Sequence, residues 1–276
     1  MTVVEPARKL APRAGEVGLW WLGQATVGLR GERANVLVDP FLSPHPDRLV
    51  PPPFAPEQVG GLHAVLCTHE HWDHFDSDSL PALAAASPAA TIVVPEPIVD
   101  QVLALGIDAA RVIGAQPDRA IELDGVVVHP VPSCHGIEPG DAYSFGRELS
   151  GGLYRYLGYV LDLGGVRVYH AGDTIPFDGL EDRLRELAVD VALLPINGRD
   201  PEREAQGIVG NMDPREAAYV ADGAGAELAI PIHFDMFEAN PGDPGAFVDA
   251  VLRDRLDVAV LVPSRSRPFL YSRSRT

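Results

Sequence analysis

Three histidines and an aspartate, His69, His71, Asp73 and His74, lie within six residues of one another in the stretch LCTHEHWDHFD. Imidazole nitrogen and carboxylate oxygen are the ligands that Zn, Fe and Mn accept in proteins at neutral pH. A loop of this composition beside an apolar strand would be costly to desolvate without a cation. The stretch therefore predicts a metal site.

Three more potential ligands each follow a predicted strand. His135 ends the stretch VVVHPVPSCH, Asp173 ends VRVYHAGD and His233 ends ELAIPIH. Ligands of α/β proteins gather outside the carboxyl ends of strands, so we expect these side chains to converge with the histidine-rich loop. His129, in the same stretch as His135, is the alternative third histidine.

Together these side chains are too many for one tetrahedral ion and predict two divalent ions that share a carboxylate. Zn is the expected metal, with Mn or Fe as alternatives. Such a pair lowers the pKa of a bridging water, and the resulting hydroxide attacks a carbonyl or phosphoryl centre. Asp73 is the predicted catalytic residue, because it can accept a hydrogen bond from the nucleophile and pass a proton to the leaving group.

The elements that must position these residues are short. Apolar, β-branched runs such as NVLVD and GLHAVLC predict strands, and GG at 164–165 predicts a hairpin turn. Helices are predicted over 76–86, 98–106, 180–188, 213–224 and 244–256. Each half of the chain has strands first and strand–helix alternation afterwards. This order predicts an α+β domain of two similar halves, with sheets inside and helices outside.

The predicted boundaries are a leader over 1–18, a single domain over 19–263 and a C-terminal tail over 264–276, whose four arginines suggest a solvated segment. The formal charge of −17 argues against nucleic-acid and membrane partners, which leaves a small-molecule substrate. Two cysteines, no signal peptide and no apolar run of membrane-spanning length predict a cytoplasmic protein. The sequence is compatible with a homo-oligomer.

The pattern H-x-H-x-D-H at His69–His74, preceded by Thr68, resembles the metallo-β-lactamase superfamily. The resemblance implies a four-layer αββα sandwich. It also implies two ligand groups joined by a bridging carboxylate. The first ion would take His69, His71 and His135, the second would take Asp73, His74 and His233, and Asp173 would bridge them.

Further stretches, among them LWWLGQATVGL, VYHAGDT, VDVALLPINGR, GNMDPREA and AIPIHFDMF, are similar to the branch that contains L-ascorbate-6-phosphate lactonase. This similarity implies hydrolysis of a small ester or lactone, sugar-derived or phosphorylated. The segment between Asp39 and His63 is much shorter here than in that lactonase, so the substrate pocket need not match. The branch is more distantly similar to N-acylphosphatidylethanolamine phospholipase D.

The sequence is also compatible with other functions. The alternatives are a phosphodiesterase of the phospholipase D kind, a tRNA-processing nuclease, a diiron oxidoreductase and a metal-binding module without catalysis. The acidic composition disfavours the nuclease, and no flavin-binding domain accompanies the chain for the oxidoreductase.

Four residues are candidates for substrate binding. Asn197 and Arg199 follow the predicted strand DVALLPI, Asn211 lies in the loop GRDPEREAQGIVGNM that could form a pocket wall, and Trp72 lies inside the metal loop. Arg199 could hold a phosphate or carboxylate through its guanidinium, or pair with Glu202 or Glu204. The alternatives are loop anchoring for Asn211 and packing for Trp72.

Several residues near the ligands have structural interpretations. Asp235 either orients an imidazole or caps a helix, and Asp39 is expected to hold the histidine loop. We expect buried core positions for His170, Cys67, Cys134, Trp20 and Trp21, surface positions for His45 and His63, and a place facing the site for Gln24.

Overall fold

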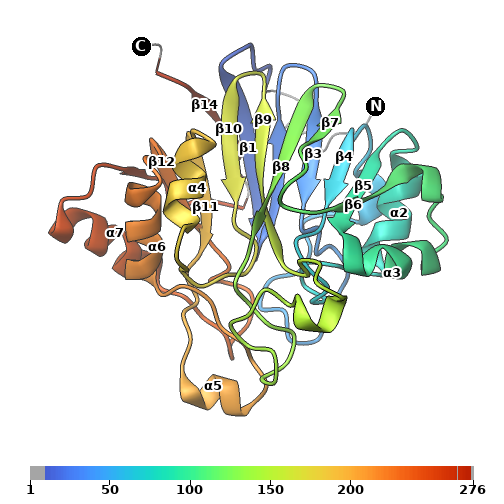
Figure 1. Cartoon of the computed structure of the whole chain (residues 1–276). Coiled ribbons are helices and arrows are strands. Elements are labelled where there is room, and N and C mark those ends of the chain that lie inside the picture. The colour runs from blue at the N-terminus through green and yellow to red at the C-terminus, as the bar shows by residue number, and fades with distance from the viewer. Residues whose placement is uncertain (1–9, 266, 275–276) are drawn as a thin grey trace.

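The computed structural model describes residues 10–265 and 267–274 and shows two facing β-sheets with helices on both outer sides (Figure 1). Each sheet has seven strands. The described residues contain no helix long and apolar enough to cross a membrane.

The first sheet has the strand order β14-β1-β2-β3-β4-β5-β6. Strands β14, β1, β2 and β3 pair antiparallel, and β3 to β6 pair parallel. The bounds are β1 Glu16–Gly23, β2 Thr26–Arg30, β3 Asn35–Val38, β4 Ala64–Leu66, β5 Thr91–Pro95, β6 Val112–Ala115 and β14 Phe269–Ser272.

The second sheet repeats this plan in the order β13-β12-β11-β10-β9-β8-β7. Strands β7 to β10 form an antiparallel meander, and β10 to β13 pair parallel. The bounds are β7 Ile121–Leu123, β8 Val126–Pro132, β9 Leu157–Leu163, β10 Val166–His170, β11 Val191–Pro195, β12 Leu228–Ile232 and β13 Ala259–Val260.

Helices cover the outer face of each sheet, except for the short helix α5, which lies among the loops beyond the edge of the sandwich (Figure 1). The bounds are α2 Ser79–Ala86, α3 Val99–Ala104, α4 Leu180–Glu186, α5 Pro201–Ala205, α6 Pro214–Gly223 and α7 Pro244–Asp254. Apolar side chains form one core between the sheets and one core under the helices on each side. Strand β11 is buried at every position, as a strand covered on both faces must be. The predicted αββα sandwich of two similar halves is confirmed.

Local signals explain where the helices begin. Asp213 accepts the backbone N–H groups of Arg215 and Glu216, and Pro214 occupies the first helical position of α6. The helix predicted from residue 76 begins instead at Ser79, because the Asp76 carboxylate accepts N–H groups ahead of it. Helix α5 was not predicted, although Asp200-Pro201 carries the same start signal as α6.

The interpretation of residues 264–276 as a solvated tail is wrong for its central part. Residues Phe269–Ser272 form β14, which pairs antiparallel with β1 in the register Glu16↔Ser272 to Leu19↔Phe269. Strand β1 also begins at Glu16, inside the predicted leader, while residues 1–9 lie outside the described residues. Strand β14 was missed because four residues with two arginines nearby carry little strand signal without their partner strand.

Candidate metal centre

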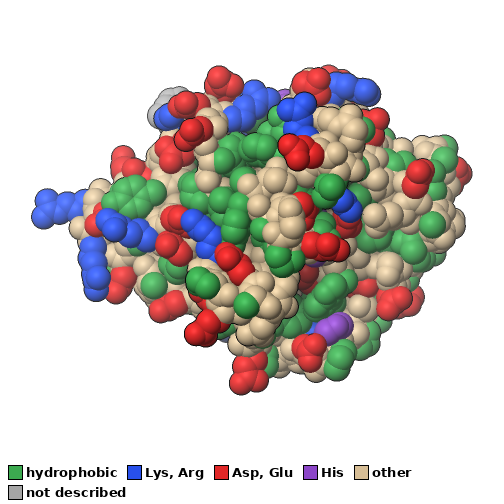
Figure 2. All heavy atoms as spheres, turned by 60° about the horizontal axis from the view of Figure 1, so that its bottom comes forward, with side chains coloured by type: hydrophobic (Ala, Val, Ile, Leu, Met, Phe, Trp, Pro, Cys, Tyr) green, Lys and Arg blue, Asp and Glu red, His purple; other side chains and the backbone are tan. Residues whose placement is uncertain are grey.

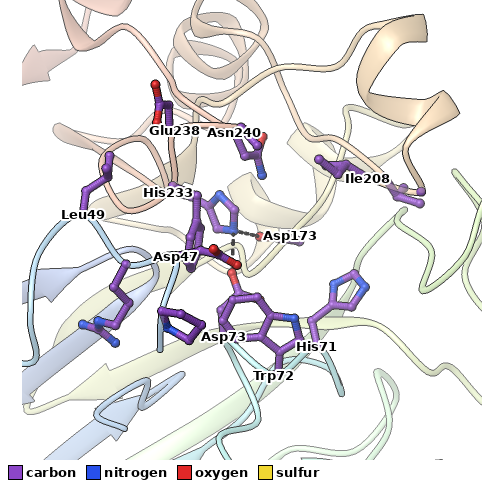
Figure 3. A pocket seen from close by; sticks show the side chains of 16 residues that line it. Asp47, Leu49, His71, Trp72, Asp73, Asp173, Ile208, His233, Glu238 and Asn240 are labelled. Atoms are coloured by element: carbon purple, nitrogen blue, oxygen red, sulfur yellow. Dashed lines mark ion pairs between the residues drawn. The ribbon is translucent and has the colours of Figure 1, made fainter. Parts of the chain in front are cut away.

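All seven predicted ligands come together at one edge of the sandwich. They form two groups, and within each group one potential ligand atom per residue lies within 4.8 Å of the others. One group is His69, His71, His135 and Asp173, and the other is Asp73, His74 and His233. Figure 3 shows members of both groups, among them His71 and His233, at the bottom of one pocket.

Asp173 lies between the groups and presents one oxygen to each. Its Oδ1 is 3.3 Å from Nε2 of His74 and 3.3 Å from Nε2 of His233. Its Oδ2 is 3.6 Å from Nε2 of His135. This is the arrangement of a carboxylate that serves two neighbouring cation sites.

The ligands converge because the strands that carry them end at the same edge. His69–His74 follow β4, His135 follows β8, Asp173 follows β10 and His233 follows β12. The two sheets are tied together directly below the centre, where the Leu157 N–H donates to the Thr68 carbonyl and the Tyr159 hydroxyl donates to the Cys67 carbonyl. Gly172 allows a close approach here, since a Cβ on it would lie 2.7 Å from the Thr68 Cβ.

Asp39 holds the histidine loop, as predicted. One oxygen accepts the Thr68 N–H (2.8 Å), and the other accepts the Thr68 hydroxyl (2.8 Å) and Nδ1–H of His74 (2.7 Å). The Thr68 hydroxyl oxygen in turn lies 3.0 Å from Nδ1 of His69. Both imidazoles therefore turn Nε2 toward the centre, and the neutral form with its proton on Nδ1 is the one that would bind a metal ion there.

The charges of the centre suit a cation. Burial raises the pKa of Asp73, but the neighbouring His74 and His233 outweigh it and hold this pKa well below its usual range. The pKa of Asp173 is lowered against burial by His233 and His74 in the same way. Burial lowers the pKa of His135 to about 3. Both carboxylates are thus ionised and His135 is neutral, the forms in which these groups bind metals.

Two buried atoms at the junction of the groups support the fit to a metal. Nε2 of His74 and Oδ1 of Asp173 have no hydrogen-bond partner among the described residues. Buried polar atoms are normally hydrogen-bonded, so unpaired ligand atoms in a convergent set indicate a binding site. The pKa of His74 is raised, because Asp173, Asp73 and Asp39 outweigh the effect of burial, and metal binding must displace its proton.

The structure separates the two candidates for the third histidine. His135 is fully buried and belongs to the first ligand group. His129 lies within β8, outside both groups, where burial and the neighbouring Arg167 lower its pKa.

The centre opens into a pocket of about 540 Å³. Trp72 lines it, is 47% exposed and stacks on His45 with ring centroids 4.1 Å apart. The partly buried His45, predicted to be a surface residue, thus supports the pocket wall. Leu49, Ile208 and Phe237 also line the pocket and were not identified from the sequence, because no pattern marks loop residues that meet only in the folded chain.

The polar residues predicted to bind substrate lie mostly outside this pocket. Arg199 donates to both oxygens of Glu216 at 2.6 and 2.7 Å, so its partner is neither Glu202 nor Glu204. The Asn211 amide donates to Oδ1 of Asn197, and the Asn197 amide donates to Oδ1 of Asn240. Of these three hydrogen-bonded asparagines, only Asn240 lines the pocket.

Asp235 does neither of the two things predicted for it. Its Oδ1 accepts the backbone N–H of Gln24 (3.1 Å), and its other oxygen pairs with Arg265. Gln24 reaches the centre itself: its amide nitrogen donates to Oδ2 of Asp73 at 2.8 Å and lies 2.9 Å from Nε2 of His233. The turn after β1 thereby positions ligands of the second group.

The predicted core positions are confirmed, whereas His63, expected at the surface, is partly buried and accepts the Asn35 N–H at Nδ1 (3.1 Å). His170 is fully buried, donates from Nε2 to the Ala25 carbonyl (2.7 Å) and accepts the Gly172 N–H at Nδ1. Cys67 and Cys134 are free and buried, and burial raises the pKa of both thiols. Trp20 and Trp21 belong to the core.

Two facing sheets with outer helices and an H-x-H-x-D-H loop at their edge define a metallo-β-lactamase fold. The chain belongs to the β-lactamase superfamily, because the family model described as "Beta-lactamase superfamily domain" matches residues 34–234.

The chain is 33% identical over 239 residues to a "UPF0173 metal-dependent hydrolase" of Rubrobacter xylanophilus, covering 84% of this chain and 88% of that protein. A relative with the same description from Methanoregula boonei is 33% identical over 255 residues and covers 90% of this chain and 96% of its own.

Solved structures share the fold at lower identity. Igni18, a metallo hydrolase of Ignicoccus hospitalis, superposes with a TM-score of 0.72 at 22% identity and covers 94% of this chain and 100% of that chain. An isothiocyanate hydrolase from Delia radicum gut bacteria gives a TM-score of 0.71 at 17% identity and covers 92% and 99%.

Proposed function

We propose that this protein is a metal-dependent hydrolase that cleaves a small ester or lactone with two divalent transition-metal ions, Zn being the expected metal. The observation that carries the proposal is the pair of ligand groups, joined by Asp173, at the bottom of an open pocket. The relatives' description as metal-dependent hydrolases supports the same reaction class. The similarity to the L-ascorbate-6-phosphate lactonase branch stays a prediction.

The protein's own residues have distinct tasks in this reaction. Bound metal supplies a nucleophile at neutral pH and polarises the substrate oxygen. Asp73 lines the pocket, so its carboxylate is placed to accept a proton from the nucleophile and deliver it to the leaving oxygen. Gln24 fixes the orientation of that carboxylate through Oδ2. Asp39 and Thr68 keep the Nε2 atoms of His74 and His69 turned inward.

A substrate screen tests the reaction class. The protein is purified, reconstituted with Zn or Mn and assayed on lactones, carboxylic esters and phosphodiesters, with EDTA treatment and His71→Ala as controls. We expect hydrolysis of esters or lactones that both controls abolish. Activity confined to phosphodiesters would replace the proposal with a phosphodiesterase, and no activity on any compound would favour a metal-binding module.

The role of Asp73 has its own test. Asp73→Asn keeps a ligand oxygen of the same shape but removes the charge that accepts a proton. We expect turnover to fall while elemental analysis still finds the same number of metal ions per chain as in the wild-type protein. Full turnover with both ions bound would contradict the proton-transfer role.

A further inference from the structure

The pocket above the metal centre combines apolar walls with an acidic mouth. Leu49, Trp72, Ile208 and Phe237 supply apolar side chains, and Asp47 and Glu238 are exposed carboxylates among the lining residues. Figure 3 shows Leu49 and Ile208 on opposite sides of the metal ligands, with Trp72 beside His71 and Asp73. In Figure 2 the same end of the molecule shows hydrophobic patches interspersed with acidic side chains.

Arg48 is the one lysine or arginine among the described residues that line this pocket, and its guanidinium is already engaged. Nε donates to the Val50 carbonyl (3.0 Å), and Nη1 donates to the carbonyls of Phe41 (3.0 Å) and Ser43 (3.4 Å). The guanidinium carbon also lies 4.0 Å from the centre of the Phe41 ring.

Arg48 therefore has no pair of parallel N–H groups available for a ligand. Two-pronged recognition of a phosphate or carboxylate needs two parallel N–H groups, from Nε and Nη2 or from Nη1 and Nη2. One member of each pair already bonds the backbone of its own loop. Arg199, the other arginine considered for such a role, is held by Glu216.

Away from the metal ligands, an anionic substituent would therefore meet apolar side chains and the carboxylates of Asp47 and Glu238, while Arg48 is engaged by its own loop. Burying such a substituent without a partner is costly, and Asp47 and Glu238 would repel an anion. An apolar substituent would instead gain contact with Trp72, whose ring is already fixed by the stack on His45.

We infer that the substrate is an uncharged ester or lactone whose apolar part lies against Trp72, and that phosphorylated or carboxylated substrates are disfavoured. The inference rests on the proposed hydrolase function and narrows it. It departs from the phosphorylated sugar that the sequence resemblance suggested.

A matched set of esters tests the inference with the metal-reconstituted protein. Phenyl butyrate is uncharged, phenyl hemisuccinate carries a carboxylate on the acyl side, and 4-carboxyphenyl butyrate carries one on the leaving group. We expect kcat/KM for phenyl butyrate to exceed that of both anions by about tenfold or more. Equal or faster hydrolysis of either anion would overturn the inference while leaving the hydrolase function intact.

Variants of residues at the pocket wall and at the pocket mouth show which side chains cause the preference for uncharged esters. Trp72→Ala is expected to lower kcat/KM for phenyl butyrate by about tenfold, with most of the loss restored in Trp72→Phe. Leu252→Ala, an exposed apolar position on α7, is the control for removing surface carbon. The double variant Asp47→Asn/Glu238→Gln is expected to raise kcat/KM for the anionic esters selectively, and no selective rise would contradict the repulsion.

Ligand binding gives a readout that does not depend on turnover. The uncharged ketone 4-phenyl-2-butanone is not hydrolysed, and we expect it to change the tryptophan fluorescence of the wild-type protein saturably. Most of that change should disappear in Trp72→Phe, because the other two tryptophans are buried in the core. If no ester is cleaved but this binding occurs, the hydrolase proposal fails and the apolar pocket stands. An unaltered signal in Trp72→Phe would overturn the assignment to this wall.

Discussion

The two halves of the sandwich supply the metal ligands in different ways. The first half gives four of them from a single loop after β4, which Asp39 fixes by hydrogen bonds to Thr68 and His74. The second half gives His135, Asp173 and His233, each from a separate strand end. The loop depends on one buried carboxylate, whereas the separate ligands depend on the register of a whole sheet. The two parts should respond differently to mutation.

The largest expected effect comes from removing one ligand on each side. His71→Ala takes a ligand from the loop, and His233→Asn takes one from β12 while tolerating the positive φ of 59° at that position. Each should lower kcat/KM by about a thousandfold or more, because catalysis needs the whole constellation. Elemental analysis should find the metal content per chain reduced to about half in each variant, because the opposite ligand group is intact. Two tightly bound ions per chain in both variants would refute the assignment of ligands to groups.

Asp39→Asn tests whether one carboxylate supports the whole loop. The amide cannot replace all three accepted hydrogen bonds, so we expect a loss of about 3 kcal/mol in the free energy of unfolding and a 10–100-fold weaker metal affinity, roughly as for other supporting residues. Guanidinium unfolding and chelator competition measure the two quantities.

A buried carboxylate away from the centre is the matched control for Asp39. Asp190 accepts the Arg167 N–H (2.7 Å) and pairs with Arg273 (2.9 Å) in the second sheet. Asp190→Asn should lower stability but leave metal affinity unchanged. Equal losses of metal affinity in both variants would show that general destabilisation, rather than the Asp39 network, controls the centre.

A smaller effect is expected where the halves meet. Gln24 has a φ of 52° and contacts Asp73 from the first half and His233 from the second. Asn tolerates positive φ but is one methylene shorter, so Gln24→Asn should fold normally and lose about tenfold in kcat/KM with metal content retained. Gln24→Glu keeps the length of the side chain but cannot donate the hydrogen bond to Asp73, so it should not recover the activity. Wild-type rates in Gln24→Asn would mean that Asp73 needs no such support.

The smallest effect is expected at Arg199, which sequence reasoning assigned to substrate. Its pair with Glu216 is about one-third exposed on each side, so Arg199→Met should cost about 1 kcal/mol or less in the free energy of unfolding. KM should change by less than about twofold, as should KM in the control Glu216→Gln. A tenfold rise in KM confined to Arg199→Met would restore the substrate-binding interpretation.

The loop half of the centre was more predictable from sequence than the strand-end half. His69, His71, Asp73 and His74 are close in the chain, so their spacing already limits where their side chains can lie. His135 could not be separated from His129 by sequence, because both follow the same apolar run and only the position along β8 distinguishes them. The helices and strands were largely predictable, since local periodicity and capping residues specify them.

Roles that depend on distant partners were the ones missed. Asp235 binds the turn at Gln24 and pairs with Arg265, contacts between residues more than 25 positions apart. Phe269–Ser272 becomes a strand only because β1 offers it an edge. The pocket walls at Leu49, Ile208 and Phe237 come from three separate loops.

The sequence by itself determined the donor atoms, their order and the elements that carry them, because covalent spacing and side-chain chemistry are local properties. Only the tertiary structure decided that Asp173 turns one oxygen to each ligand group, that Arg199 and Arg48 are held by neighbours and that Leu49, Ile208 and Phe237 line the pocket above the metal centre. These features follow from how segments far apart in the chain pack together, because that packing decides which partner each side chain meets.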